Sequence, residues 1–309
     1  MNKTQNLLLG LAIGDAFGIA YETMSRHEIP VVFNFSKYNK HPKEGWGNKA
    51  GAYTDDTQMS IAITELLLSR KPLTEKAFAD YFVKTYKRDE RNGYGKGLRI
   101  ALPKVSDGKE LMEQLKKDSI RNGAAMRATP LGILKNPKLV IEAALTNASV
   151  THNTPQGRAS SVCMALASHY FLYDVGAISG LFDYCLRLSS GIHRESTDYW
   201  LAVSKMKELD PVLLFGEKDK DFGIPCDGMR TAGAVLYLVS KYPDTVSVLR
   251  ESVLLGGDTD SVAALATGLK AVQGGLDTLP EFLLRDLENN EFGKDYLICL
   301  GDKLSKLLD

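Results

Sequence analysis

The segment that most constrains this chain is a tight turn followed directly by an apolar helix. Residues 256–261 read Gly-Gly-Asp-Thr-Asp-Ser. Over residues 262–272 the apolar side chains recur every three or four positions, which predicts a buried helix. The chain must therefore bring two carboxylates and two hydroxyls to the start of a helix that lies inside the molecule.

Two roles are open for these side chains. Asp, Thr and Ser at a helix start can cap the free N–H groups of its first turn. Two Asp with a Thr and a Ser exceed what one cap uses, and hard oxygen ligands at this density suit Mg²⁺, Mn²⁺ or Ca²⁺. Taken alone, residues 256–261 are compatible with a cap and with a metal site.

A second acidic turn favours the metal. Residues 53–58 read Tyr-Thr-Asp-Asp-Thr-Gln and precede another apolar helix, predicted over 57–70. Adjacent carboxylates repel each other, and Lys49 is the only Lys or Arg between Asn48 and Arg70. We therefore expect the two turns to converge on a centre of one or two hard divalent cations bound from solution.

The rest of the chain also has helical periodicity. Helices are predicted over 7–20, from 74 onward, and over 156–173, 229–239, 246–255 and 279–307, the last as one amphipathic tail. In the first of these, small residues at 10, 12, 14, 16 and 18 would let a neighbouring helix or a ligand approach closely. With no alternating strand pattern and no repeat, the sequence predicts an all-α fold in one domain over 1–309.

Charge and cysteine usage limit the possible partners. Lys plus Arg equal Asp plus Glu at 38 each, so no net field attracts nucleic acid or an anionic membrane. No uninterrupted apolar stretch reaches the length of a membrane span. The four scattered cysteines lack metal or redox spacing, which favours reduced thiols. We expect a monomeric, cytoplasmic protein.

Four further candidates stand out, and three of them have two readings. Glu22, at the end of the first helix, either faces the acidic turns or is a solvated charge. Gly93-Tyr94-Gly95 either approaches a ligand or forms a helix-ending turn. Residues 121–127 are expected to start a helix whose free N–H groups could hold a phosphate. His152 is either structural or a ligand contact, whereas the other four histidines are read as ordinary.

Five stretches of the chain resemble a known family. They are GLAIGDAFGIAYE at 10–22, YTDDTQMSIAI at 53–63, NGAAMRATPLG at 122–132, VTHNTP at 150–155 and GGDTDSVAALATGL at 256–269. In this order and at this separation, the chain resembles the ADP-ribosylglycohydrolase family. That family includes the bacterial dinitrogenase-reductase-activating glycohydrolase and the vertebrate ADP-ribosyl-acceptor hydrolases.

The resemblance implies a fold, a cofactor and a set of site residues. The fold would be a compact orthogonal helical bundle holding two Mg²⁺ or Mn²⁺ ions. The implied metal ligands are Thr54, Asp55, Asp56, Asp258, Asp260 and Ser261. Glu22, Asp258 and Asp260 are the candidates for activating water. The implied contacts to ADP-ribose are Gly93, Tyr94, Gly95, Asn122, Gly123, Ala124, Met126, Arg127 and His152.

The resemblance also implies an activity. The chain would be a metal-dependent hydrolase that cleaves the glycosidic bond between ADP-ribose and a modified protein side chain, with arginine as the expected acceptor. A small ADP-ribosyl ester or an ADP-ribosylated base is an alternative substrate. A non-catalytic ADP-ribose binder or structural relative is the alternative class, and the complete set of acids in both turns argues against it.

Overall fold

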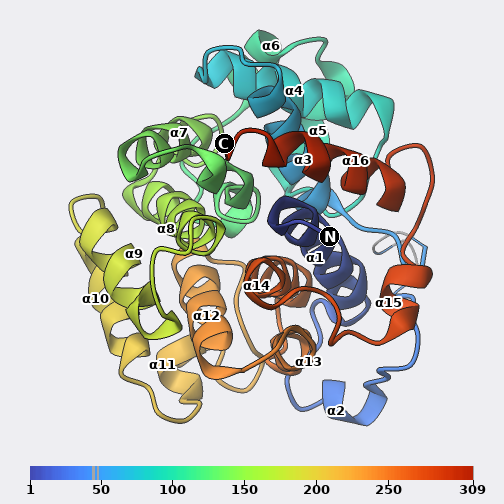
Figure 1. Ribbon diagram of the computed structural model, residues 1–309, viewed down its shortest axis with the longest axis vertical. Coiled ribbons are helices and arrows are strands. Elements are labelled where there is room, and N and C mark those ends of the chain that lie inside the picture. The colour runs from blue at the N-terminus through green and yellow to red at the C-terminus, as the bar shows by residue number, and fades with distance from the viewer. Residues whose placement is uncertain (44–45, 47–48, 309) are drawn as a thin grey trace.

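A computed structural model describes residues 1–43, 46 and 49–308 of the chain (Figure 1). The backbone of these residues forms helices, turns and two isolated bridge pairs, and no strand. The predicted all-α class is therefore confirmed.

The helices follow one another with short connections. The α-helices are α1 Lys3–Gly18, α2 Ile29–Val32, α3 Asp55–Leu68, α4 Glu75–Arg88, α5 Lys96–Ala101, α6 Gly108–Gln114, α7 Pro137–Ser149, α8 Pro155–Leu172, α9 Leu181–Ser189, α10 Arg194–Ser204, α11 Pro211–Phe215, α12 Gly228–Lys241, α13 Thr245–Leu254, α14 Thr259–Gly274, α15 Glu281–Arg285 and α16 Lys294–Ser305. Short 3₁₀ helices are η1 Ile19–Tyr21, η2 Leu102–Lys104, η3 Asn122–Ala124, η4 Thr129–Ile133 and η5 Ile178–Gly180.

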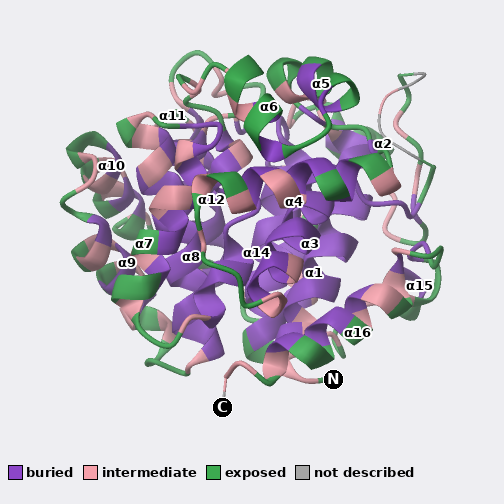
Figure 2. Ribbon diagram, turned by 90° about the horizontal axis from the view of Figure 1, so that it is seen from above, coloured by how far each residue is buried: buried purple, intermediate pink, exposed green. Residues whose placement is uncertain are grey.

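Helix α14 lies near the middle of the molecule. Figure 1 shows α1 beside it and α8, α12 and α13 around it. Every residue of α14 from Thr259 to Val272 is buried, as the apolar pattern predicts for this segment. In Figure 2 the central helices are coloured almost wholly as buried, whereas exposed surface gathers on peripheral helices such as α10.

Glycines allow α1 to touch the backbone of α14. A Cβ atom added at Gly14 would lie 2.1 Å from the carbonyl oxygen of Ala263. Additions at Gly10 and Gly18 would approach backbone atoms of α14 to within 2.8 Å and 2.5 Å. The small face predicted for α1 is therefore occupied by another helix, and this contact joins the two ends of the chain.

Two predicted elements were wrong in detail. The tail is not one helix, because the chain leaves the helical path between α15 and α16 at residues 286–293. There the Glu288 carboxylate turns inward and pairs with the buried Arg91 guanidinium. Residues 121–127 form the short turn η3 rather than the start of a longer helix.

None of the helices in the described part of the chain combines the length and apolarity that crossing a bilayer requires.

The close contact of α1 with α14 predicts the effect of one methyl group. Gly14→Ala should lower the free energy of unfolding by about 1–3 kcal/mol, because the new Cβ meets backbone that has no rotamer to change. Urea unfolding followed by circular dichroism measures the change. Gly191→Ala is the matched control, since a Cβ there meets nothing within 4 Å. Equal stability of the two variants would contradict the prediction.

Candidate active site

The two acidic turns meet at the buried starts of α3 and α14. Carboxylate oxygens of Glu22, Asp258 and Asp260 all lie within 4.8 Å of one another. Burial raises the pKa of Asp56 and the nearby Ser261 side chain lowers it, so the first turn of α3 faces the first turn of α14. The structure thus brings together segments that are about two hundred residues apart in the sequence.

The glycine pair places Asp258 beside Glu22. Gly256 and Gly257 have φ angles of +74° and +75°, which only glycine adopts without strain. The N–H of Gly257 donates to the carbonyl of Met24 over 2.9 Å, and the N–H of Thr23 donates to the carbonyl of Gly257 over 2.8 Å. The turn before α14 is therefore tied to the segment that directly follows Glu22.

Asp15, from α1, organises the start of α3. Its carboxylate accepts hydrogen bonds from the backbone N–H groups of Thr54 and Thr57, the shortest at 2.9 Å and 3.0 Å. It also accepts from the hydroxyls of Thr54 and Thr57 at 2.8 Å and 2.7 Å. Since the Thr54 hydroxyl hydrogen is used in this way, its oxygen lone pairs remain available to a cation.

The side chains at the capping positions of α3 and α14 do not cap their helices. Thr54 and Asp258 occupy the capping positions of α3 and α14, yet neither side chain accepts a bond from its own first turn. By contrast, side chains cap the first turns of α1, α4, α8, α12 and α13 in the ordinary way. One oxygen each of Asp56 and Asp260 is buried without a hydrogen-bond partner. Such oxygens and their neighbours form a hard donor set that fits Mg²⁺ or Mn²⁺.

The pKa values of the clustered carboxylates also favour a bound cation. Burial, followed by neighbouring carboxylates, raises the pKa values of Asp55, Asp56 and Asp260 well above the ordinary range. Burial and then Asp258 raise the pKa of Glu22 to about 7. Within the described residues no Lys or Arg forms an ion pair with these carboxylates. A bound divalent cation would supply the missing positive charge.

Two residues that the sequence did not single out hold Glu22. The indole N–H of Trp46 donates to Glu22 Oε2 over 2.6 Å, and His41 Nε2 lies 2.7 Å from the Glu22 carbonyl oxygen. Both belong to the long polar and aromatic segment that follows α2. A connecting segment of this length is typical of a functional surface, but no local pattern in the sequence connects Trp46 or His41 with Glu22.

The predicted ADP-ribose contacts around residue 94 lie against α3. A Cβ added at Gly93 would lie 1.9 Å from Asp55 Oδ1, so the carboxylate rests on the glycine backbone. The Tyr94 hydroxyl donates to Gln58 Oε1 over 2.6 Å inside the protein. Gly95 is open, since a Cβ there would meet nothing within 4 Å.

A second group of predicted contacts lies on the other side of the acids. The Asn122 amide donates to Asp258 Oδ2 over 2.6 Å and accepts from the Cys226 thiol, which supports Asp258. A Cβ added at Gly123 would lie 2.7 Å from the His152 ring. Ala124 and Arg127 are fully buried and Met126 is nearly so, which leaves little of their side chains to touch a ligand.

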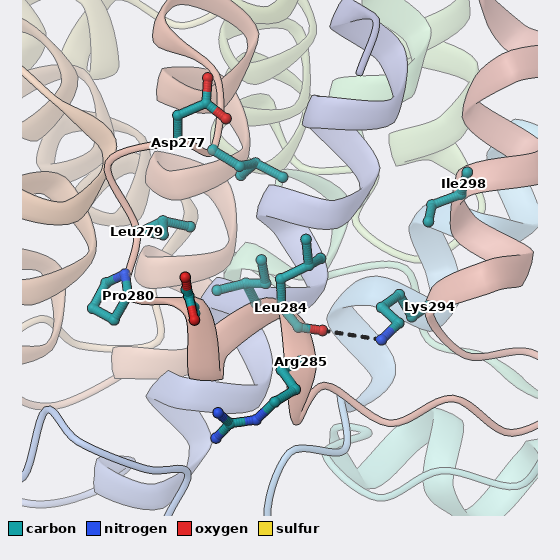
Figure 3. Close-up of a pocket in the computed structure, with 10 residues that line it drawn as sticks. Asp277, Leu279, Pro280, Leu284, Arg285, Lys294 and Ile298 are labelled. Carbon is teal, nitrogen blue, oxygen red and sulfur yellow. Dashed lines mark hydrogen bonds between the residues drawn. The ribbon is translucent and has the colours of Figure 1, made fainter.

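The hollow drawn in Figure 3 is a different feature. It has a volume of about 520 Å³ and lies between α15, α16 and the chain after α14, with Ile13 of α1 in its wall. Lys294 there donates to the Leu284 carbonyl, as the dashed line shows. None of the acids at the starts of α3 and α14 lines this hollow, so it is separate from the acidic cluster.

Known proteins resemble this chain over nearly its whole length. The family model described as ADP-ribosylglycohydrolase matches residues 1–309. ADP-ribosylhydrolase ARH3 of Xenopus tropicalis is 25% identical, covering 99% of this chain and 96% of its own length. The ADP-ribosyl-dinitrogen reductase glycohydrolase of Rhodospirillum rubrum is 27% identical, covering 93% and 90%. A solved structure titled ADP-ribosylglycohydrolase-related protein complex shares the fold, with a TM-score of 0.72, 22% identity, and coverage of 100% and 98%.

The unpartnered carboxylates predict how metal-free stability depends on pH. A carboxyl whose pKa is raised on folding stabilises the chain below its unfolded value, 3.8 for Asp, and loses that contribution as the pH rises through the folded value. In EDTA, Asp260→Asn should therefore raise the Tm by a few degrees at pH 8 and by less at pH 5. Differential scanning fluorimetry measures both, and the exposed Asp277→Asn is the control. An Asp260→Asn variant less stable than the parent at pH 8 would overturn this account.

Proposed function

The chain belongs to the ADP-ribosylglycohydrolase family, and we propose that it hydrolyses the bond between ADP-ribose and a modified protein side chain, with arginine as the acceptor. One observation carries the proposal. The acidic turns at the starts of α3 and α14 meet, and they keep buried carboxylate oxygens without protein partners. A non-catalytic relative would have no need to keep these costly oxygens.

Two Mg²⁺ or Mn²⁺ ions are the proposed cofactor. The residues that would hold them are Thr54, Asp55, Asp56, Asp258, Asp260 and Ser261. When bound, such cations neutralise the cluster, hold ribose hydroxyls and lower the pKa of water. The hard oxygens of this set suit both ions and do not distinguish them.

The chain's own residues have separable roles in the reaction. Cleavage at C1 of the ribose builds positive charge on the sugar ring, and the surrounding carboxylates stabilise that charge. Glu22 is the first candidate to take the proton from the attacking water, since a carboxylate oxygen of Glu22 lies within 4.8 Å of those of Asp258 and Asp260. The Trp46 indole donates to Glu22 Oε2, so Oε1 is the oxygen that would take the proton. Asp258 and Asp260 are the other candidates for this proton.

Arginine is the proposed acceptor because of charge. A glycosylated guanidinium is positively charged before cleavage and leaves as a neutral guanidino group. Such a cationic substrate is attracted by the net negative charge that would remain on five carboxylates after two divalent cations bind. The same cluster would also accept a serine linkage, whose alkoxide leaves less easily, or an aspartate linkage, whose carboxylate leaves more easily but whose acceptor carries no positive charge. Whether the substrate is a protein or a small ADP-ribosyl compound depends on the surface that contacts the acceptor, and not on the acidic cluster.

The remaining assignments concern ADP-ribose itself. We propose contacts from Gly93, Tyr94, Gly95, Asn122, Gly123, Ala124, Met126, Arg127 and His152. The N–H of the buried Met126 already donates to the Asn122 carbonyl, so backbone contact to a diphosphate would come from the N–H groups at the start of η3. The Arg127 side chain would act from inside the protein rather than on the ligand.

The proposed activity predicts which linkage is cleaved and what abolishes cleavage. Peptides ADP-ribosylated on arginine, serine or aspartate should be incubated with Mg²⁺, with Mn²⁺ and with EDTA, and released ADP-ribose measured by chromatography. We expect release from the arginine-linked peptide, abolished by EDTA and lowered at least a hundredfold by Asp55→Ala or Asp258→Ala, since each removes a charged ligand. Asp277→Ala serves as the control.

Each other result has a distinct meaning. Release from the serine or aspartate peptide alone would replace arginine as the acceptor. ADP-ribose binding without release from any peptide would favour the non-catalytic binder. Full activity in both Asp variants would refute the assignment of the acidic turns as the site.

The contact between Gly93 and Asp55 predicts the effect of a second glycine substitution. Gly93→Ala should weaken Mn²⁺ binding at least tenfold, because the Cβ would displace the Asp55 carboxylate and strain a φ of +108°. Isothermal titration calorimetry measures the affinity, and circular dichroism checks the fold. Gly97→Ala is the matched control, with only ordinary contact to Leu115 at 3.7 Å. Unchanged Mn²⁺ affinity in Gly93→Ala would contradict a ligand role for Asp55.

A further inference from the structure

Arg127 is a buried cation that forms no ion pair with a carboxylate in the described part of the chain. Its side chain is 0% exposed, and burial lowers its pKa to about 9. Charged side chains are almost never buried to this degree without a carboxylate partner. The groups that contact the Arg127 guanidinium in place of a carboxylate therefore indicate the role of Arg127.

The guanidinium joins three elements around its position. Nε donates to Asn147 Oδ1 over 2.6 Å, and Nη2 donates to the Asn147 carbonyl over 3.0 Å, at the end of α7. Nη1 lies 3.6 Å from the sulfur of Met59 in α3, and the guanidinium carbon lies 4.5 Å from the Phe82 ring centroid in α4. One N–H of Nη2 remains, and it donates to the Thr151 hydroxyl oxygen over 2.8 Å.

The Thr151 hydroxyl transmits this contact to His152. Its oxygen lies 2.6 Å from His152 Nδ1, and it already accepts from Arg127. If Nδ1 carried the hydrogen, the Thr151 hydrogen would have no acceptor among the described residues, although Thr151 is only 5% exposed. An unsatisfied buried hydroxyl is unfavourable, so the Thr151 hydrogen points to Nδ1.

The geometry therefore points to a relay: we propose that Arg127, through the Thr151 hydroxyl, holds His152 with its hydrogen on Nε2, so that Nε2–H donates a hydrogen bond to bound ADP-ribose. Arg127 is then a positioning residue that does not touch the ligand. The contact of His152 with ADP-ribose rests on the proposed function, whereas the relay itself rests on the hydrogen bonds.

The position of the ring supports a role at the site. Nε2 has no protein partner among the described residues, and it would lie 3.1 Å from a Cβ added at Gly123. Gly123 follows Asn122, whose amide holds Asp258. Burial, and then Arg127 and Arg121, lower the pKa of His152 to about 3, which keeps the ring neutral with a single N–H.

Side-chain nitrogen NMR reads this arrangement directly. The chain is labelled with ¹⁵N-histidine, and the five histidines are separated by the signal lost in His152→Gln. We expect Nδ1 of His152 to be an unprotonated, hydrogen-bonded nitrogen and Nε2 to carry the hydrogen. A His152 with the hydrogen on Nδ1 overturns the proposal, and this measurement needs neither ligand nor turnover.

Variants at Thr151 test the relay without removing a buried charge. Arg127→Met is the direct substitution, but loss of a buried guanidinium can unfold the chain, so Thr151→Val and Thr151→Ser are used. Thr151→Val should move the Nδ1 signal of His152 to that of a free acceptor and weaken ADP-ribose binding about threefold to tenfold, the effect of one neutral hydrogen bond. Thr151→Ser should restore both.

A matched control separates the relay from a general packing effect. Thr267→Val removes a buried hydroxyl that has no partner, and it should change neither the NMR signal nor the ADP-ribose affinity. Thr151→Val with an unchanged Nδ1 signal and unchanged affinity would refute the relay. Failure of the proposed function would give a different result, because the protein without any substitution would then not bind ADP-ribose.

Discussion

Repulsion between buried carboxylates is the constraint on which the centre of this molecule depends. Asp55, Asp56, Asp258 and Asp260 are held together without a Lys or Arg ion pair in the described residues. Burial raises the pKa values of all four, and neighbouring carboxylates raise those of Asp55, Asp56 and Asp260 further. A fold that tolerates such repulsion must hold the carboxylates in place with hydrogen bonds from neighbouring residues. Asp15 does so for α3 with four hydrogen bonds, and Asn122 does so for Asp258. The acids keep their outward oxygens for a ligand of opposite charge.

The helices supply the rigidity that such a cluster needs. Contact between the backbones of α1 and α14 sets the position of Asp15 relative to the start of α14, and the glycines of α1 make that contact possible. The ties from Thr23 and Met24 to Gly257 then place Glu22 beside Asp258. Packing thus holds side chains from distant parts of the sequence within a few ångströms of one another. Such fixed positions suit a site that must orient a ribose.

Much of this could be predicted from sequence, because the informative patterns are local. The helical periods, the small face of α1 and both acidic turns are each visible within a dozen residues, and the fold class followed from them. Contacts between distant side chains were not visible. Trp46 and His41 beside Glu22, and the inward-facing Arg127, depend on how loops and helices meet. The tail was misjudged because Glu288 satisfies a remote cation, Arg91, at the expense of helix continuity. The monomeric state and cytoplasmic location stay predictions.

The pairing of α1 with α14 also has a consequence for biosynthesis. Helix α1 leaves the ribosome before its main partner α14, which lies more than two hundred residues later in the chain. Until α14 is made, the glycine face of α1 and the Asp15 carboxylate lack the surface that buries them. Contacts at such sequence separation slow folding and leave intermediates open to aggregation. Chaperone protection of the nascent chain would therefore matter most before α14 emerges.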